Sequence, residues 1–476
     1  MCRLPDKMRP ATLAFSVLLG WCASVAVQAG ESAASRATPI GLYDYVVTAV
    51  RESDTARDLQ DNLFLRQFDL ELAQSRFETK LVPLTNILIG NDTGTQTVGF
   101  EARRDTETGT TLTAGIASDK FTSNNYDVTN PYQTRAYVRV SQGLFRRWGR
   151  EYNRAPLTQA EIQQRKEGYL AEVKRQGLLL DAVQRYFEVL LHRKLLPQNE
   201  QPLKRRVRHL ASARTRNSVG LVYKCAVYRA ELAKLAAESL LKDQMRILRR
   251  AQEALHELVA LERIDTLNPN APIVRLIPVI PDNWQAQLLE NRGEWHAYLM
   301  DLRSTDLSLY RAERDTQPDI SLNLTVAQEG LGDSFDKSAK LDETEWTLQL
   351  QLRSTLSMDD EKAALARERV LHAKARREGR AVRRKILREA REAVEDLAAE
   401  ERRNKISVEQ LRQANAAVEL AVVRYSRGLS SDLDVLDAEA QLAQAQLDIW
   451  RSLVAFNVAA IRMGKAFGML DLDCLR

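Results

Sequence analysis

The side chains with the clearest chemical potential in this sequence are the aspartates that follow a glycine in RYSRGLSSDLDVLDAEA, residues 424–440. Asp434 and Asp437 are three positions apart, so a helix would place both carboxylates on one face, one turn apart. Such a pair can bind a cation, or it can simply be favoured by the positive end of the helix dipole. The residues by themselves leave both interpretations open.

Other reactive arrangements are scarce. The sequence has five histidines and none of the motifs HExxH, CxxC, G-x-S-x-G or the phosphate-binding loop. Cys225 and Cys474 remain after a predicted signal peptide. We expect them to lie tens of ångströms apart, at about 1.5 Å per helical residue, too far for an intrachain disulfide. We therefore predict a protein that is not an enzyme and has no cofactor and no metal.

The region around Gly428 has an earlier counterpart, which suggests an internal repeat. RNSVGLVYKCAVYRAELAKLAA, residues 216–237, aligns with the later segment at an offset of 208 residues, and Gly220 coincides with Gly428. In both copies a long helical pattern ends at the glycine, whose backbone is permissive. Ser430, Ser431 and Asp432 can then cap a returning helix.

Composition and the N-terminus indicate an exported, helix-rich protein. Charged residues make up 28% of the 476 residues, and glycine and proline are sparse, which is typical of long helices with exposed faces. A net charge of +5 is too small to indicate nucleic acid as a partner. Basic residues, then an apolar run over 11–27 and small residues before Gly30, predict a signal peptide over 1–29.

Strands are predicted where apolar and polar residues alternate, in TTLTAGIAS (110–118), RAYVRVS (135–141), ISLNLTV (320–326) and WTLQLQLRS (346–354). The segment 87–109 could add another hairpin, so the number of strands in the first half stays open. Helices are predicted over 43–81, 145–217, 222–262, 284–316, 358–426 and 431–467. Pro197 and Pro202 should kink or break the second of them.

These elements divide the chain into two repeats. We predict a first repeat over 30–262, with a hairpin at about 110–144 and a helix end near 220. A proline-rich linker over 263–283 leads to a second repeat over 284–470, with a hairpin at about 320–354 and a helix end near 428. A short tail, 471–476, follows.

A duplicated strand hairpin on helices of about 100 Å resembles the outer membrane efflux protein family typified by TolC. The resemblance covers almost the whole mature chain and rests on SQGLFRRWGREYNRAPL (141–157), on the matching strand of the second half and on RYSRGLSSDLDVLDA. It implies an α+β membrane protein: a trimeric 12-stranded β-barrel, about four strands per chain, continued by a long periplasmic helical barrel.

The resemblance also implies roles for residues at the helix ends. Asp434 and Asp437 match aspartates that ring the periplasmic entrance, and Tyr425 and Arg427 match residues that lock the closed gate. The position of the tyrosine's acidic partner holds Ala226, which departs from the family pattern. The tips that would bind the adaptor protein are Gly220, Leu221, Gly428 and Leu429.

Strand parity predicts which residues face water and which face lipid. The apolar sets built on Leu112, Val138, Leu322 and Leu350 should face lipid. The residues predicted to line the barrel lumen are Arg135, Arg139, Asn323, Gln349 and Gln351. The two arginines could be wetted lumen residues or a selective anion site.

The resemblance implies an exit duct in the outer membrane of a Gram-negative bacterium, serving tripartite efflux or type I secretion. It would assemble as a homotrimer and contact outer membrane lipid. Its protein partners would be a periplasmic adaptor and an inner-membrane pump of the RND or ABC type. The alternative is an exported coiled-coil scaffold, which the arginine-rich segment 377–403 would suit. The duplicated hairpins favour the channel, whose cargo the sequence does not name.

Overall fold

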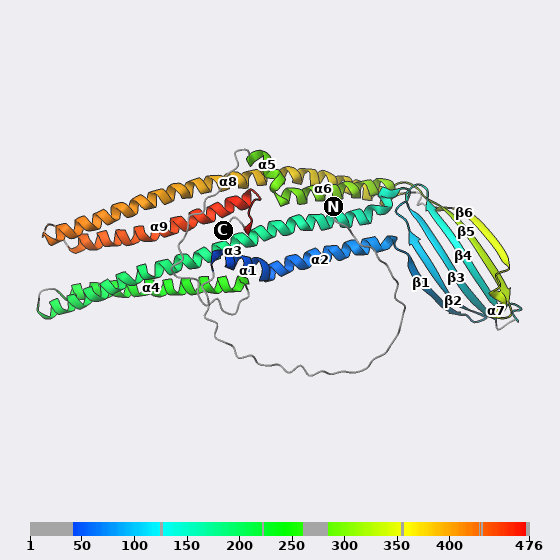
Figure 1. Ribbon diagram of the computed structural model, residues 1–476, viewed down its shortest axis with the longest axis horizontal. Coiled ribbons are helices and arrows are strands. Elements are labelled where there is room, and N and C mark those ends of the chain that lie inside the picture. Colours follow the sequence, from blue (N-terminus) through cyan, green and yellow to red (C-terminus); the bar gives the residue numbers. More distant parts are fainter. Residues whose placement is uncertain are drawn as a thin grey trace, which may run out of the picture. The chain divides into compact units, whose positions relative to one another are not determined.

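In the computed structural model the described residues are 41–123, 127–220, 223–259, 284–353, 357–427, 429 and 432–472. The predicted signal peptide, Cys474 and the whole predicted proline-rich linker lie outside them. Long helices and one antiparallel sheet account for most of the described residues, so the predicted α+β class with long helices is confirmed (Figure 1).

The sheet has six strands, and each pairs with its neighbours in chain order. They are β1 (Lys80–Ile89), β2 (Thr93–Asp105), β3 (Thr110–Ser123), β4 (Tyr132–Gly143), β5 (Asp319–Gly332) and β6 (Glu343–Arg353). All five pairings are antiparallel. A short helix, α7 (Phe335–Ser338), lies in the β5–β6 connection.

The expectation of about four strands per chain is therefore corrected to six. The additional pair, β1 and β2, includes the segment that the sequence left open. β1 reads KLVPLTNILI, with apolar residues on both faces, so it lacks the alternation by which the other strands were predicted. Because β1 begins at Lys80, the preceding helix ends at Gln74, and the predicted helix end at Leu81 is wrong.

The helices form two similar sets along two long rods. One rod, α3 (Arg150–Ser218), packs against α4 (Lys224–Val259), α1 (Leu42–Glu52) and α2 (Asp54–Gln74). The other, α8 (Asp359–Ser426), packs against α9 (Asp432–Ala466), α5 (Trp284–Asn291) and α6 (Gly293–Asp315). Figure 1 shows α4 and α9 running back beside the rods from the ends farthest from the sheet.

Two helices are interrupted at a single residue whose side chain makes hydrogen bonds near the break. Ser53 separates α1 from α2, and its hydroxyl accepts a hydrogen bond from the Ala56 amide at 3.1 Å. Arg292 separates α5 from α6. By contrast, α3 is assigned as one helix through Pro197 and Pro202, so the two prolines do not break it.

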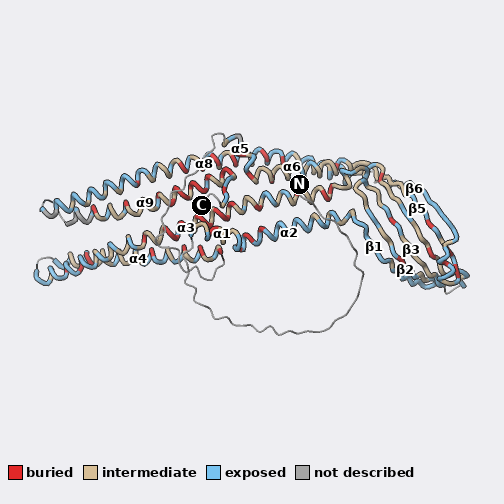
Figure 2. The backbone as a smooth tube through the Cα atoms, in the orientation of Figure 1, coloured by how far each residue is buried: buried red, intermediate tan, exposed pale blue. Residues whose placement is uncertain are grey.

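Apolar packing is concentrated near the middle of the helices (Figure 2). One cluster joins α1, α3, α4 and α9 around Tyr45, Leu179 and Leu255, and the Tyr45 hydroxyl donates to the Leu255 carbonyl at 3.1 Å. A second cluster joins α5, α8 and α9 around Leu288 and Ile386. These clusters position the rods that carry the sheet.

A buried arginine ties three helices together beside the second cluster. Arg292 is 5% exposed, and its guanidinium donates to Glu294 at 2.9 Å, to Glu389 at 2.7 Å and to the Ala466 carbonyl at 2.7 Å. Burial alone would raise the pKa of Glu294, but the hydrogen bonds and charge of Arg292 outweigh it and hold that pKa below its usual value. The Glu294 carboxylate is thus ionised at neutral pH.

We predict that Arg292→Met destabilises the helical part by about 3 kcal/mol, because it leaves two carboxylates and a carbonyl without their donor. The readout is the midpoint of the thermal loss of helical circular dichroism in detergent. The matched control is Arg388→Met, since Arg388 is exposed and its pair with Glu392 spans 3.6 Å. It should cost less than about 1 kcal/mol. Equal losses in both variants would contradict the role of Arg292.

Candidate functional site

The two faces of the sheet differ in chemistry, because residues of opposite parity point to opposite sides. One face carries Leu112, Val138, Val326, Leu348 and Leu350, which the register places side by side across β3 to β6. Its side chains are uncovered: Leu350 is 67% exposed and Trp346 is 70% exposed. We call this the apolar face.

The opposite, polar face carries all five residues predicted from parity to line a lumen. Register pairing joins Asn323 to Gln349, and Arg135, Arg139 and Gln351 share their parity. The five residues therefore lie on one surface of the sheet within one chain.

Ion pairs and hydrogen bonds connect the polar face across strands. Arg135 Nε lies 2.8 Å from Glu329 Oε1, and the Tyr137 hydroxyl donates to Glu101 at 2.7 Å. Arg139 Nε donates to the Thr325 hydroxyl at 3.3 Å. Since Arg135 is paired with a carboxylate, this face has mixed charge and is not a simple anion site.

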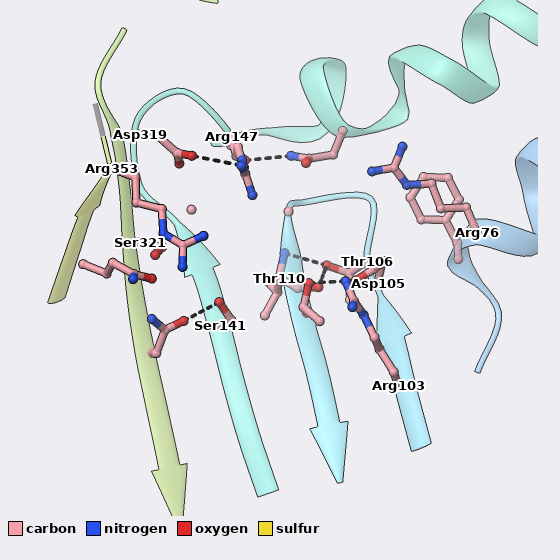
Figure 3. A pocket seen from close by; sticks show the side chains of 17 residues that line it. Arg76, Arg103, Asp105, Thr106, Thr110, Ser141, Arg147, Asp319, Ser321 and Arg353 are labelled. Atoms are coloured by element: carbon pink, nitrogen blue, oxygen red, sulfur yellow. Dashed lines mark hydrogen bonds and ion pairs between the residues drawn. The ribbon is translucent and has the colours of Figure 1, made fainter. Parts of the chain in front are cut away.

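A hollow of about 270 Å³ lies on the polar face at the end of the sheet nearest the helices (Figure 3). Four arginines line it with two aspartates: Arg76, Arg103, Arg147, Arg353, Asp105 and Asp319. Arg147 pairs with Asp319 at 2.9 Å, and Arg103 pairs with Asp105 at 3.4 Å. Arginine therefore exceeds acid at this level of the sheet.

The role of these arginines was not predicted from the sequence, although a signal for them exists. β2, β4 and β6 are the strands that run toward the helices, and each has an arginine of the hollow within four residues of its end. These are Arg103, Arg147 and Arg353. The end of an inward-running strand thus marks this hollow in the sequence.

The segment that follows β4 attaches the sheet to the helices. Arg146 lies 2.9 Å from Asp315 at the end of α6 and 3.7 Å from Glu361 in the first turn of α8. The Tyr152 hydroxyl donates to the same Asp315 carboxylate at 2.6 Å. These contacts link α3, α6 and α8 at the base of the sheet.

The predicted gate and tip residues lie at the opposite ends of the rods. Asp434 and Asp437 are both exposed in the first turns of α9, and Arg427 is exposed just after α8. Tyr425 is in the last turn of α8, and its side chain lies outside the described part of the structure. Ala226 is in the first turn of α4.

The two tips are described in part. Gly220 has φ +75°, a left-handed conformation that favours glycine, and it follows the end of α3. Leu429 is exposed at the other tip. Leu221 and Gly428 lie outside the described residues. The described tip residues lie at the helix ends farthest from the sheet (Figure 1), so the sheet and the tips form two separate candidate sites.

Cys225 is exposed and is a free thiol. Within the described ranges, no three His, Cys, Asp or Glu side chains are grouped so that they could hold a metal ion. No helix in that part of the chain has the length and apolarity needed to cross a membrane.

Comparisons with known proteins give a family and a fold. Residues 285–468 match the family model described as outer membrane efflux protein. A search of curated proteins returns no significant match. The family match confirms the resemblance indicated by the sequence, and it concerns transport proteins rather than enzymes.

Several solved structures have the same fold. The outer membrane protein VceC from Vibrio cholerae aligns with TM-score 0.67 and 16% identity, over 90% of this chain and 96% of VceC. A membrane protein from Pseudomonas aeruginosa aligns with TM-score 0.70 and 16% identity, over 90% and 93% of the two chains. The open state of the MtrE outer membrane channel from Neisseria gonorrhoeae aligns with TM-score 0.68 and 15% identity, over 90% of this chain and 88% of MtrE.

The two faces of the sheet should respond differently to a buried charge. We predict that Leu350→Arg on the apolar face costs a few kcal/mol, about 2–4 if the residue meets the middle of a bilayer. The neighbouring Gln349→Arg on the polar face should be tolerated. The measurement is the amount of each variant that inserts into outer membranes. If both variants insert equally, the assignment of the faces is wrong.

Proposed function

We propose that this chain, whose residues 285–468 belong to the outer membrane efflux protein family, forms an exit duct through the outer membrane of a Gram-negative bacterium. The observation that supports this proposal most strongly is the two-faced sheet: one face is apolar and uncovered, and the other is polar from β2 to β6. Lipid would cover the first face and water the second. The long helices would continue the duct into the periplasm.

The sheet edges support an obligate oligomer, for which the family resemblance implies three copies. Among the described residues, β1 and β6 each have one edge without a neighbouring strand. Unpaired backbone groups are too costly in lipid, so an open sheet must close with other copies. The matching order of helices and strands in the two halves supports an internal repeat, with α3 and α4 corresponding to α8 and α9.

The helix tips are the proposed contact with the other components of the system. We assign Gly220, Leu221, Gly428 and Leu429 to the surface that binds a periplasmic adaptor. An inner-membrane pump of the RND or ABC type would complete a tripartite efflux or type I secretion system. Exposure of Leu429 and the turn at Gly220 fit this assignment, since an apolar side chain at a protruding turn is available to a partner.

A gate at the same end would use the acidic start of α9. In a trimer, three copies each of Asp434 and Asp437 would form two rings of negative charge, which favour cations. Tyr425 and Arg427 would hold the closed state. Ala226 cannot accept a hydrogen bond through its side chain, so this lock differs from the family pattern.

The rival function, a coiled-coil scaffold, leaves the sheet unexplained. A scaffold needs only the helices, and an uncovered apolar surface spread over several strands would promote its aggregation. The cheapest test is the state of the protein in cell fractions. The proposal expects trimers that dissociate on heating in the outer membrane fraction. A soluble periplasmic protein would refute it.

We predict that replacing Asp434 and Asp437 together by alanine reduces cation selectivity and relieves block by multivalent cations in single-channel recordings, because the rings lose their charge. The matched control is Asp54→Ala with Asp58→Ala, two exposed acids one turn apart in α2. This control should conduct as the parent does. Unchanged selectivity and block in the first variant would remove these residues from the entrance.

A further inference from the structure

The β1–β2 hairpin is an integral part of the sheet. β1 and β2 are paired from Lys80–Arg103 to Ile89–Gly94, and β2 and β3 from Thr93–Ser123 to Asp105–Thr111. These ladders run over the whole length of the strands. The hairpin therefore widens the wall of the sheet.

The apolar face of the sheet continues onto both strands of the hairpin, and the polar face continues onto β2. On the apolar face, Ile89 of β1 is 85% exposed and Phe100 of β2 is 56% exposed, and Phe100 is in register with Ile116 of β3. On the polar face, Glu101 accepts from Tyr137, and Asp119 accepts from Thr97. β2 thus has the same two environments as the strands that carry the proposed duct, whereas β1 is apolar on both faces.

The apolar band crosses all six strands at the slant of a membrane barrel. Lys80 of β1 and Thr347 of β6 lie in one row of paired residues. The exposed apolar residues run from Leu81 to Ile89 on β1 but from Trp346 to Leu352 on β6. On β1 the middle of the band lies five residues from Lys80, on the side away from the helices. On β6 it lies two residues from Thr347, on the side toward the helices.

This displacement gives the tilt of the strands. A shift of about seven residues is about 23 Å, and five strand spacings are about 24 Å. The strands are therefore tilted by about 45° to the band, close to the roughly 35–45° of transmembrane barrels. A hairpin that merely lay beside a membrane would not be expected to continue the slant.

The two edge strands also fit each other. β1 has 10 residues and β6 has 11, and a tilted strand needs about 9–11 to cross a bilayer. β1 leaves the helices and β6 returns to them, so neighbouring copies would bring these edges together antiparallel. Pro83 removes one amide from β1 and leaves the others available.

We infer that β1 of each chain pairs with β6 of the next, so that three chains with six strands each close an 18-stranded barrel rather than a 12-stranded one. The inference rests on the trimer of the proposed function. Because barrel diameter grows roughly in proportion to strand number, the lumen would be about 1.5 times wider. Barrels of about 16–18 strands enclose a water-filled channel, so the outer pore would admit bulky solutes without rearrangement.

Disulfide trapping at the seam tests the strand number. If the band stays level across the seam, Asn86 of one chain faces Gln349 of the next on the polar face. The background is a chain in which the native cysteines are replaced by serine. In it we would combine Asn86→Cys with Gln349→Cys. Two further variants, with Leu84→Cys or Leu88→Cys in place of Asn86→Cys, test the neighbouring registers. The competing 12-stranded seam is tested by Thr113→Cys or Ala117→Cys with Gln349→Cys.

The expected result is oxidant-dependent covalent trimers for a β1–β6 pair, at least tenfold above either single variant, and none for the β3–β6 pairs. Heat-sensitive trimers of the cysteine-free parent in the same outer membrane fraction are the reference. Trimers that cross-link only through β3, or at none of the tested pairs, overturn the 18-stranded seam. A parent that forms no trimers refutes the proposed function itself, so the two failures are distinguishable.

Discussion

Pairing of backbone groups at the edges of the sheet is the constraint on which the rest of the structure depends. Inside the sheet every strand has two neighbours, but β1 and β6 each have one. Water can satisfy the free edges of a soluble protein, whereas lipid cannot. The uncovered apolar face therefore makes the edges the least stable part of an isolated chain. α2 precedes β1 and α8 follows β6, so each edge strand is joined to a helix at the same end of the sheet. Neighbouring copies can therefore meet edge to edge with their helices on the same side.

The helices solve a different problem, because a rod of about 100 Å buries little surface alone. Each rod is covered by shorter helices, and apolar clusters lie where these meet. Toward the tips, packing is supplemented by ion pairs such as Arg205–Glu439 between α3 and α9, at 3.2 Å. Such pairs are partly exposed and contribute modestly. The stable centre therefore separates two ends, the sheet and the tips, that can serve different partners.

The sequence predicted the features that repeat over many residues and missed those that depend on context. The two rods, their return helices and the alternating strands β3 to β6 were recognised from periodicity. β1 was missed because Leu84 and Leu88 make its second face apolar as well. The arginine hollow was missed because Arg76 and Arg353 come together only through the sheet. The alternation of side chains along each strand placed Arg139 and Gln349 on one face, because the pairing of strands fixes which residues share a face.

The pairing of β4 with β5 has a consequence for the order of folding. Strands β1 to β4 follow one another directly, so their pairing closes only short loops. β5 meets β4 only across a long separation: Gln133 donates to Glu329, 196 residues later, at 3.2 Å. The chain between them contains α3, α4 and α6. Closing so large a loop is entropically costly unless those helices have already folded back on themselves. The helical hairpins would then act as the template that completes the sheet, and slowing their folding would stall the chain with a four-stranded intermediate.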